Sequence, residues 1–220
     1  MSEMNTEQAR FNMIEQQIRP WDVLDQTVLD LIQAVPRENF VAPQYHNLAF
    51  ADLGVPIGHG EVMMAPKVEA RMLQALAIQP HETVLEIGTG SGYVTALLAK
   101  LARHVYSVEL QADFLVHATN KLREHRIANV TLEQGDAAQR WELCSPYDVI
   151  AITGSLPVLP EHFQQTLNVG GRLFAIVGDA PAMEAMCITR VGQSEFQVKK
   201  LFETNLPPLH NALQPNRFHF

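Results

Sequence analysis

The stretch Val84-Leu85-Glu86-Ile87-Gly88-Thr89-Gly90-Ser91-Gly92-Tyr93 decides the fold of this chain. It begins with apolar residues typical of a buried strand, and its three alternate glycines let the backbone turn tightly and approach a ligand without Cβ clashes. A helix that starts after such a turn directs free N–H groups toward the ligand. A second strand, residues 104–109, ends in Glu109, whose carboxylate can accept hydrogen bonds from both hydroxyls of a ribose. The pattern predicts a cofactor that contains adenosine.

The spacing of the glycines distinguishes between two such cofactors. A dinucleotide-binding turn has a third glycine three positions after the second, and Tyr93 occupies that position here. The glycines instead follow Glu86 in the form E-x-G-x-G-x-G, which resembles the first motif of class I S-adenosylmethionine-dependent methyltransferases. S-adenosylmethionine carries a sulfonium cation and no phosphate, so carboxylates near the turn suit it better than an anion site would. We therefore expect S-adenosylmethionine rather than NAD.

Composition argues against several other classes of function. The 220 residues carry a net charge of −8 and no basic cluster longer than Val198-Lys199-Lys200, so we expect no nucleic-acid partner. We expect neither a membrane span, which needs roughly 18 apolar residues in a row, nor a secretory signal. The two cysteines, Cys144 and Cys187, are expected to be buried thiols of a cytoplasmic protein. The nine histidines are dispersed, so no metal site is predicted.

Strands and helices alternate through the middle of the chain. The pattern predicts parallel strands over residues 83–87, 104–109, 130–134, 149–153 and 172–177, and helices over 91–101, 113–125 and 159–167. Such alternation is typical of a doubly wound α/β fold with helices on both faces of the sheet. Two extended runs, 185–190 and 195–203, complete a mostly parallel seven-stranded sheet of the class I methyltransferase, Rossmann-like kind. In that kind of sheet the last strand is expected to insert antiparallel.

The first third of the chain has a different character. Apolar residues at helical spacing predict helices over residues 5–35, interrupted near Pro20-Trp21, and over 67–77, with an irregular segment over 36–66 between them. We therefore divide the chain into three parts. Residues 1–78 form an N-terminal helical and loop extension that packs on the core, 79–205 form the methyltransferase domain, and 206–220 form a C-terminal tail.

Several segments resemble one specific family, the protein-L-isoaspartate (D-aspartate) O-methyltransferases. Residues 35–41, Val-Pro-Arg-Glu-Asn-Phe-Val, look like the family segment V-P-R-E-x-F-V, and residues 55–60, Val-Pro-Ile-Gly-His-Gly, are similar to its turn L-P-I-G-x-G. Residues 85–93 match its motif L-E-I-G-T-G-S-G-Y at every position. Gly135-Asp136, residues 145–150 and residues 170–173 fit its later motifs, so the resemblance covers roughly residues 10–180.

The resemblance implies a protein-repair activity. Such enzymes transfer a methyl group from S-adenosylmethionine to the α-carboxyl of an L-isoaspartyl residue, so the expected partner is a damaged protein or peptide. That carboxylate is already ionised, and the enzyme mainly has to hold oxygen and methyl carbon in line about 3 Å apart. The resemblance and the glycine motif together imply these cofactor-binding residues: Glu86, Gly88, Thr89, Gly90, Ser91, Gly92, Tyr93, Glu109, Leu110, Asp136 and Ala137.

One departure from the family pattern concerns the methyl acceptor. After L-P-I-G-x-G the family continues Q-T-I-S-Q-P, whereas this chain continues Glu61-Val62-Met63-Met64-Ala65-Pro66. Met64 thus takes the catalytic position of the serine that, in the family, hydrogen-bonds the acceptor carboxylate. Methionine offers only a weak thioether acceptor and cannot donate. Losing a hydrogen bond to a charged group costs about 1.5–3 kcal/mol, or about ten- to hundredfold in rate.

Other readings of the sequence remain open. Ala137 replaces a family glycine, and Thr153 or Ser155 is a candidate for a polar contact to the substrate, although Ser155 is as readily a helix cap. One alternative function is a protein that binds S-adenosylmethionine but acts on a different acceptor or has lost isoaspartyl activity. Another is an NAD-dependent oxidoreductase, which Tyr93 disfavours. Residues 211–220 lie beyond the family match and are expected to form a tail.

Overall fold

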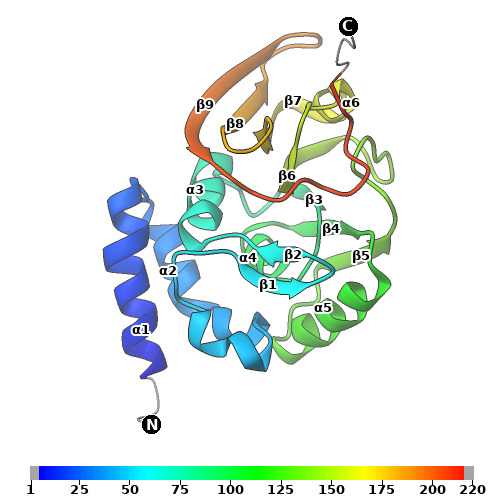
Figure 1. Cartoon of the computed structure of the whole chain (residues 1–220). Coiled ribbons are helices and arrows are strands. Elements are labelled where there is room, and N and C mark those ends of the chain that lie inside the picture. The colour runs from blue at the N-terminus through cyan, green and yellow to red at the C-terminus, as the bar shows by residue number, and fades with distance from the viewer. Residues whose placement is uncertain (1–4, 216–220) are drawn as a thin grey trace, which may run out of the picture.

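The computed structural model describes residues 5–215 and places a seven-stranded sheet at the centre of the molecule (Figure 1). Its strand order is β5-β4-β3-β6-β7-β8-β9, and the first five of these strands are parallel. This confirms the predicted mostly parallel seven-stranded sheet. The strands are β3 Thr83–Ile87, β4 His104–Glu109, β5 Val130–Gln134, β6 Tyr147–Leu156, β7 Leu167–Val177, β8 Met183–Arg190 and β9 Phe196–Thr204.

The last strand does not insert into the sheet, contrary to the sequence prediction. Strand β8 pairs antiparallel with β7, β9 pairs antiparallel with β8, and β9 forms the edge. A short turn joins the two strands, closed by a 2.9 Å hydrogen bond from the Val191 N–H to the Glu195 carbonyl. Short connections place successive antiparallel strands side by side, which gives this order.

Helices α4 Tyr93–Leu101, α5 Ala112–Glu124 and α6 Glu161–Gln165 connect the parallel strands. Helix α4 starts two residues later than predicted because Gly92 has φ +82°, a left-handed conformation that a helix cannot contain. On α5 the buried residues Phe114, Ala118 and Leu122 recur every four positions, as a helix with one face on a sheet requires. Pro160 precedes α6 directly, and Leu167 already belongs to β7, so the predicted helix over 159–167 is shorter in the structure.

The N-terminal helices lie beside the sheet, and α1 and α2 each begin at a side-chain cap. Asn5 accepts a hydrogen bond from the Gln8 N–H at the start of α1, and Asp25 accepts from Thr27 and Val28 at the start of α2. The predicted interruption near Pro20 appears as a π-helical turn followed by a 3₁₀ turn. The elements are α1 Thr6–Met13, the π turn Ile14–Ile18, the 3₁₀ turn Arg19–Trp21, α2 Gln26–Ala34 and α3 Pro66–Leu76.

Residues 36–66 contain a two-stranded hairpin that the sequence did not reveal. Strands β1 Val55–Gly58 and β2 Glu61–Met63 pair antiparallel around His59-Gly60, and both turn residues have positive φ, +52° and +83°. Such a pair is what a tight two-residue hairpin turn requires. Pro56, Gly58 and Gly60 disguise these short strands as an irregular segment. The same segment also holds 3₁₀ turns at Arg37–Phe40 and Pro43–Leu48.

The N-terminal elements share their hydrophobic core with the sheet. One cluster of buried apolar side chains runs from Met13 on α1 through Leu97 on α4 to Leu206 after β9. Within residues 5–215 no helix is long and apolar enough to cross a membrane. The hydrophobic core is therefore continuous across residues 78 and 205, the boundaries expected from the sequence.

Arg37 ties three segments of the N-terminal part together. Its buried guanidinium donates to the carbonyls of Ala49 (2.9 Å) and Met64 (2.8 Å) and pairs with the Glu69 carboxylate. It also lies over the Tyr93 ring, 5.0 Å from the centroid. Arg37 thus makes a structural ion pair within the N-terminal part.

We expect Arg37→Met to destabilise the fold by about 3–5 kcal/mol, because it leaves the buried Glu69 carboxylate without its partner. Arg19→Met is a matched control, since Arg19 pairs with Glu15 on an exposed helix surface and should cost about 1 kcal/mol or less. Urea unfolding of the three proteins measures the difference. Equal midpoints for the two variants would contradict this role of Arg37.

Candidate active site

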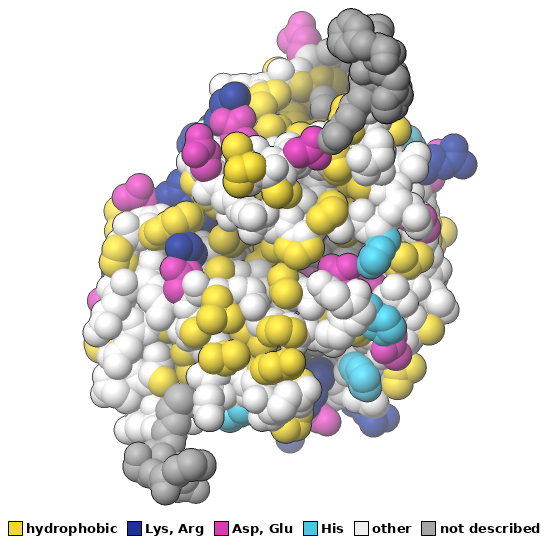
Figure 2. All heavy atoms as spheres, in the orientation of Figure 1, with side chains coloured by type: hydrophobic (Ala, Val, Ile, Leu, Met, Phe, Trp, Pro, Cys, Tyr) yellow, Lys and Arg dark blue, Asp and Glu magenta, His cyan; other side chains and the backbone are white. Residues whose placement is uncertain are grey.

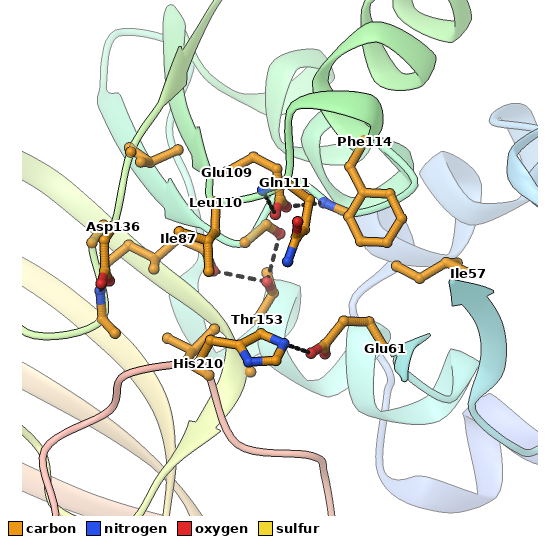
Figure 3. Close-up of a pocket in the computed structure, with 18 of the residues that line it drawn as sticks. Ile57, Glu61, Ile87, Glu109, Leu110, Gln111, Phe114, Asp136, Thr153 and His210 are labelled. Carbon is orange, nitrogen blue, oxygen red and sulfur yellow. Dashed lines mark hydrogen bonds and ion pairs between the residues drawn. The ribbon is translucent and has the colours of Figure 1, made fainter. Parts of the chain in front are cut away.

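A first cavity, with about 650 Å³ of empty space partly open to solvent, lies at the carboxyl ends of β3, β4, β5 and β6. This is the edge at which doubly wound sheets bind ligands. Figure 3 shows side chains from four separate parts of the chain converging there. Six residues predicted from the sequence line it: Gly88, Gly90, Glu109, Leu110, Asp136 and Ala137.

The glycine turn after β3 presents bare backbone to the first cavity. Gly88 and Gly90 have φ of +96° and +51°, and a Cβ at Gly88 would lie only 2.5 Å from Thr153 Oγ1. Gly92 does not line the cavity; its missing side chain instead lets α4 approach Ala118 of α5, 3.0 Å from where a Cβ would be. A glycine at position 88 is thus required by both conformation and space.

Glu109 sits at the end of β4 with its carboxylate directed at the turn. One of its oxygens accepts from the Gly90 N–H at 2.8 Å, and the other from the Gln111 N–H at 3.0 Å. An ionised carboxylate offers about four acceptor positions, so about two remain for a ligand. Because both oxygens are held by backbone amides, the orientation of this group is fixed before any ligand binds.

Asp136 lies in the loop after β5, at the opposite end of the first cavity from Ile57 (Figure 3). Its carboxylate accepts from the Ala138 N–H (3.1 Å) and from the Asn211 side-chain amide (2.8 Å). Gln139 donates to the Asn211 carbonyl at 2.9 Å. Residue 211 is therefore tied to the cavity, which corrects the prediction of a tail from that position; residues 216–220 lie outside the described part.

Glu86 and Tyr93 do not line the first cavity. Glu86 is fully buried beneath the turn, where Thr95 and Ser107 both donate to the same carboxylate oxygen, Oε2, at 2.5 Å. Tyr93 is buried against Phe40 and the Arg37 guanidinium on the side of the N-terminal elements. The structure thus gives both residues supporting positions behind the turn, while the sequence placed them at the cofactor.

A second cavity of about 310 Å³ adjoins the first. Thr89 and Ser91 line it, and Met63 and Met64 give it an apolar wall. The Met64 side chain is buried, and its carbonyl is fixed by Arg37. The two cavities share Ile57, Val62, Gly88, Gly90 and Thr153, so they meet at the glycine turn.

Glu69 is a buried carboxyl group that also lines the second cavity. Burial raises its pKa to about 7, and the charge of Arg37 opposes that rise. The sequence analysis missed this residue, because nothing in a helical stretch after Pro66 distinguishes a cavity-lining glutamate from a solvated one.

Three further residues of the first cavity also escaped prediction. Glu61 on β2 and His210 after β9 form a 2.8 Å ion pair across the mouth of the cavity, and Figure 3 shows the two side chains pointing toward each other. Phe114 on α5 lies beside Ile57. Proximity of this kind between distant segments leaves no sequence signal, although the position of Phe114 just after Glu109 was a usable clue.

Thr153 and Ser155 use their hydroxyls internally. Thr153 Oγ1 lies where the two cavities meet and donates to the carbonyls of Ile87 (2.8 Å) and Gly88 (2.7 Å). Ser155 is buried and donates to the Leu206 carbonyl at 2.7 Å, so it anchors the C-terminal segment. Ser155 does not cap the next helix, because that helix begins after Pro160 without a side-chain cap.

The cysteines differ from each other. Cys187 is buried as predicted, whereas Cys144 is exposed and has φ +64° in the loop before β6. The prediction of two buried thiols was wrong for Cys144, because a turn on the surface and not the apolar neighbours decides its exposure. Among residues 5–215, no group of three or more His, Cys, Asp or Glu side chains could hold a metal ion.

A family model described as protein-L-isoaspartate(D-aspartate) O-methyltransferase (PCMT) matches residues 8–214. This chain belongs to the PCMT family. A protein-L-isoaspartate O-methyltransferase of Rhodopseudomonas palustris is 37% identical over 201 residues, covering 91% of this chain and 92% of the relative. One from Cronobacter sakazakii is 36% identical over 202 residues, covering 91% and 95%.

Solved structures show the same PCMT fold. A Plasmodium falciparum protein described as a PCMT in complex with S-adenosyl-L-homocysteine superimposes with a TM-score of 0.80 at 20% identity, over 96% of this chain and 100% of that one. Another protein-L-isoaspartate O-methyltransferase superimposes with a TM-score of 0.79 at 22% identity, over 95% of this chain and 67% of that one. Membership of the PCMT family identifies the chain as an S-adenosylmethionine-dependent methyltransferase and confirms the resemblance seen in the sequence.

The buried position of Glu86 predicts a pH dependence of stability. Burial raises the pKa of Glu86 to about 8, against the hydrogen bonds from Ser107 and Thr95 that lower it. The folded state therefore binds more protons than the unfolded state between pH 4.5 and about 8, and the free energy of unfolding falls as pH rises through that window.

Glu86→Gln, which resembles the neutral acid, should remove the contribution of Glu86 to this fall, a slope of at most about 1.4 kcal/mol per pH unit. Glu69, whose pKa burial also raises to about 7, keeps its own contribution. Urea unfolding at about pH 5.5 and about pH 7.5, inside the window, tests the expectation. Glu124→Gln on the exposed surface of α5 is the control and should leave the slope of the unmodified protein. A Glu86→Gln protein with that same slope would contradict the prediction.

Proposed function

We propose that the first cavity holds S-adenosylmethionine and that the second cavity receives the carboxylate of an isoaspartyl residue. The observation that carries this proposal is the shared wall of the two cavities at Gly88, Gly90 and Thr153. A methyl donor and an acceptor bound on either side of that wall meet at the turn. Alignment of two reactants in this way supplies much of the rate of a transfer reaction.

The residues of the first cavity fit an adenosine group in detail. The two free acceptor positions of Glu109 suit the two ribose hydroxyls, and Asp136 offers an acceptor for the adenine amino group. Leu110 and the buried Ala137 provide apolar surface beside them. The turn at Gly88 and Gly90 leaves room for the methionine part close to the backbone. We infer that these six residues form the cofactor site.

The chemistry requires little from the protein beyond placement. S-adenosylmethionine supplies an electrophilic methyl group on its sulfonium, and an ionised carboxylate needs no base to accept it. The ion pair between Glu61 and His210 covers the mouth of the first cavity, and buried side chains such as Met63 and Met64 line the second. These residues exclude water and hold the reactants, which is the contribution that methyl transfer to a carboxylate needs.

The residues on the acceptor side are expected to lower the rate of the reaction. Met64 stands where the family places a serine, and its buried thioether cannot donate a hydrogen bond to the acceptor carboxylate. We infer that isoaspartyl peptides are methylated slowly. The second candidate function keeps the cofactor and exchanges the acceptor for a less polar one, and the apolar lining by Met63, Met64 and Val62 favours it.

The partner that we propose is a protein or peptide in the cytoplasm. Hydrophobic side chains gather on and below the β1–β2 hairpin on the face shown in Figure 2, while Lys and Arg side chains lie scattered there. An apolar surface next to the cavities suits a polypeptide better than a nucleic acid. The free Cys144 and Cys187 are in keeping with a reducing compartment.

Glu109→Ala should weaken the binding of S-adenosylhomocysteine by about 1.5–3 kcal/mol for each hydrogen bond that the Glu109 carboxylate makes to the ribose. Calorimetry measures the affinity, with the exposed Glu124→Ala as control, and NAD should bind neither protein as tightly. Glu109 also holds the turn through Gly90, so lost ribose contacts must be distinguished from a shifted turn. A 2′,3′-dideoxy analogue has no ribose hydroxyls to lose, and it should bind Glu109→Ala and Glu124→Ala equally. Unchanged affinity for S-adenosylhomocysteine in Glu109→Ala would remove Glu109 from the cofactor site.

Met64→Ser combined with Ala65→Gln should raise the methylation of an isoaspartyl peptide by about ten- to hundredfold, because it restores the family's donors at the acceptor. Methyl transfer from labelled S-adenosylmethionine measures the rate, and calorimetry with S-adenosylhomocysteine verifies an intact cofactor site. An original protein as fast as family members that retain the serine would refute slow methylation. If both proteins bind the cofactor and neither acts on the peptide, the acceptor is a different molecule.

A further inference from the structure

Three hydroxyl groups line the second cavity and could serve an acceptor there: those of Thr89, Ser91 and Thr153. With Met64 in place of the serine, an acceptor carboxylate needs another donor to replace its lost hydration. A hydroxyl can meet that need only if its own proton is free, because each hydroxyl carries a single donor. The hydrogen bonds in the structure decide which of the three qualifies.

Two of the three hydroxyls are already engaged within the protein. Thr153 Oγ1 lies 2.8 and 2.7 Å from the carbonyl oxygens of Ile87 and Gly88, which can only accept, so its proton goes to them. Thr89 is buried, and its Oγ1 lies 2.6 Å from Ser107 Oγ, where either hydroxyl can be the donor. Ser107 in turn bonds to Glu86 at 2.5 Å, so the Thr89 hydroxyl belongs to the buried hydrogen-bonded chain under the turn.

Ser91 differs from both. Its oxygen accepts a hydrogen bond of 3.3 Å from the Tyr93 N–H at the start of α4, and among residues 5–215 its own proton has no acceptor. The side chain is half-buried, and it lines the second cavity but not the first. It stands between Gly90 and Gly92, on the stretch of backbone that separates the two cavities.

Glu69 is the competing group in the second cavity, and its geometry argues against it. Its carboxylate is paired with the Arg37 guanidinium, which also donates to the carbonyls of Ala49 and Met64 and is not among the residues that line the cavity. An ionised Glu69 would repel a carboxylate acceptor. A neutral hydroxyl such as that of Ser91 carries no such penalty.

We propose that the Ser91 hydroxyl donates a hydrogen bond to the acceptor carboxylate and so replaces part of the hydrogen bonding that is missing at Met64 and Ala65. This proposal rests on the proposed isoaspartyl substrate and adds a catalytic residue to it. The hydrogen bond would hold one carboxylate oxygen while the other forms the bond to the methyl carbon; the bond from that carbon to the sulfonium sulfur would break, and S-adenosylhomocysteine would leave as a neutral thioether. The Tyr93 N–H holds the Ser91 oxygen in place. No proton is transferred, because the carboxylate reacts in its ionised form.

The test compares four proteins on one isoaspartyl peptide: the original chain, Ser91→Ala, Met64→Ser, and the combination of both changes. Ser91→Ala should lower kcat/KM about ten- to hundredfold, and Ser91→Thr, which keeps the hydroxyl, should lose much less. Met64→Ser should restore activity to Ser91→Ala, because the family donor then returns. The effect of losing Ser91 is thus expected to be large in the original chain and small in the Met64→Ser protein, which a purely structural role would not produce.

Calorimetry with S-adenosylhomocysteine separates this role from cofactor binding, and Thr119→Ala on the exposed face of α5 is a matched loss of one hydroxyl. Unchanged activity of Ser91→Ala, a parallel loss of cofactor affinity, or failure of Met64→Ser to rescue would each overturn the proposal. Turnover that appears only with Met64→Ser and Ala65→Gln together would overturn it as well, while leaving the isoaspartyl substrate intact. No turnover by any variant would overturn both.

Discussion

The close approach of β3 and β6 at the glycine turn is the constraint on which the rest of the site depends. Thr153 Oγ1 occupies the space that any Cβ at Gly88 would need and bonds to the Ile87 and Gly88 carbonyls. The turn can therefore neither carry a side chain at that point nor shift away from β6. Its backbone becomes a thin wall with one cavity on each side. A methyl donor and an acceptor need such a wall, because they must be held separately yet meet at one point.

The wall is supported from behind by buried polar groups. Glu86, Thr95, Ser107 and Thr89 form a buried hydrogen-bonded chain under the turn. On the N-terminal side, Arg37 fixes the Met64 carbonyl and pairs with Glu69. Both networks hold the turn and the lip of the second cavity in one position, since a buried polar group that loses its partner is costly. The acid of the glycine motif is thus a structural support as well as a sequence signature.

The C-terminal segment completes the site from the opposite direction. After β9 it crosses near the end of β6 (Figure 1), where Ser155 exchanges backbone hydrogen bonds with Pro207 and Leu209 and donates its side-chain proton to Leu206. From there His210 reaches Glu61 across the mouth, and Asn211 holds Asp136. Glu109 and Asp136 of the first cavity and Met64 of the second therefore come from different segments. A change such as Met64 can alter the acceptor without disturbing the cofactor side.

The sequence by itself determined the family and the order of the strands and helices around the glycine turn. Three strand ranges agreed to the residue, because hydrophobic period, glycine conformation and an acidic strand end are local properties. It also brought Gly88, Gly90, Glu109 and Asp136 to one sheet edge, since parallel strands end together. Only the tertiary structure decided that β9 forms the edge, that Glu86 and Tyr93 lie behind the turn, and that Ser91 lines the second cavity. Those outcomes depend on which distant side chains share a space and which hydroxyl protons are already taken, and no local pattern encodes them.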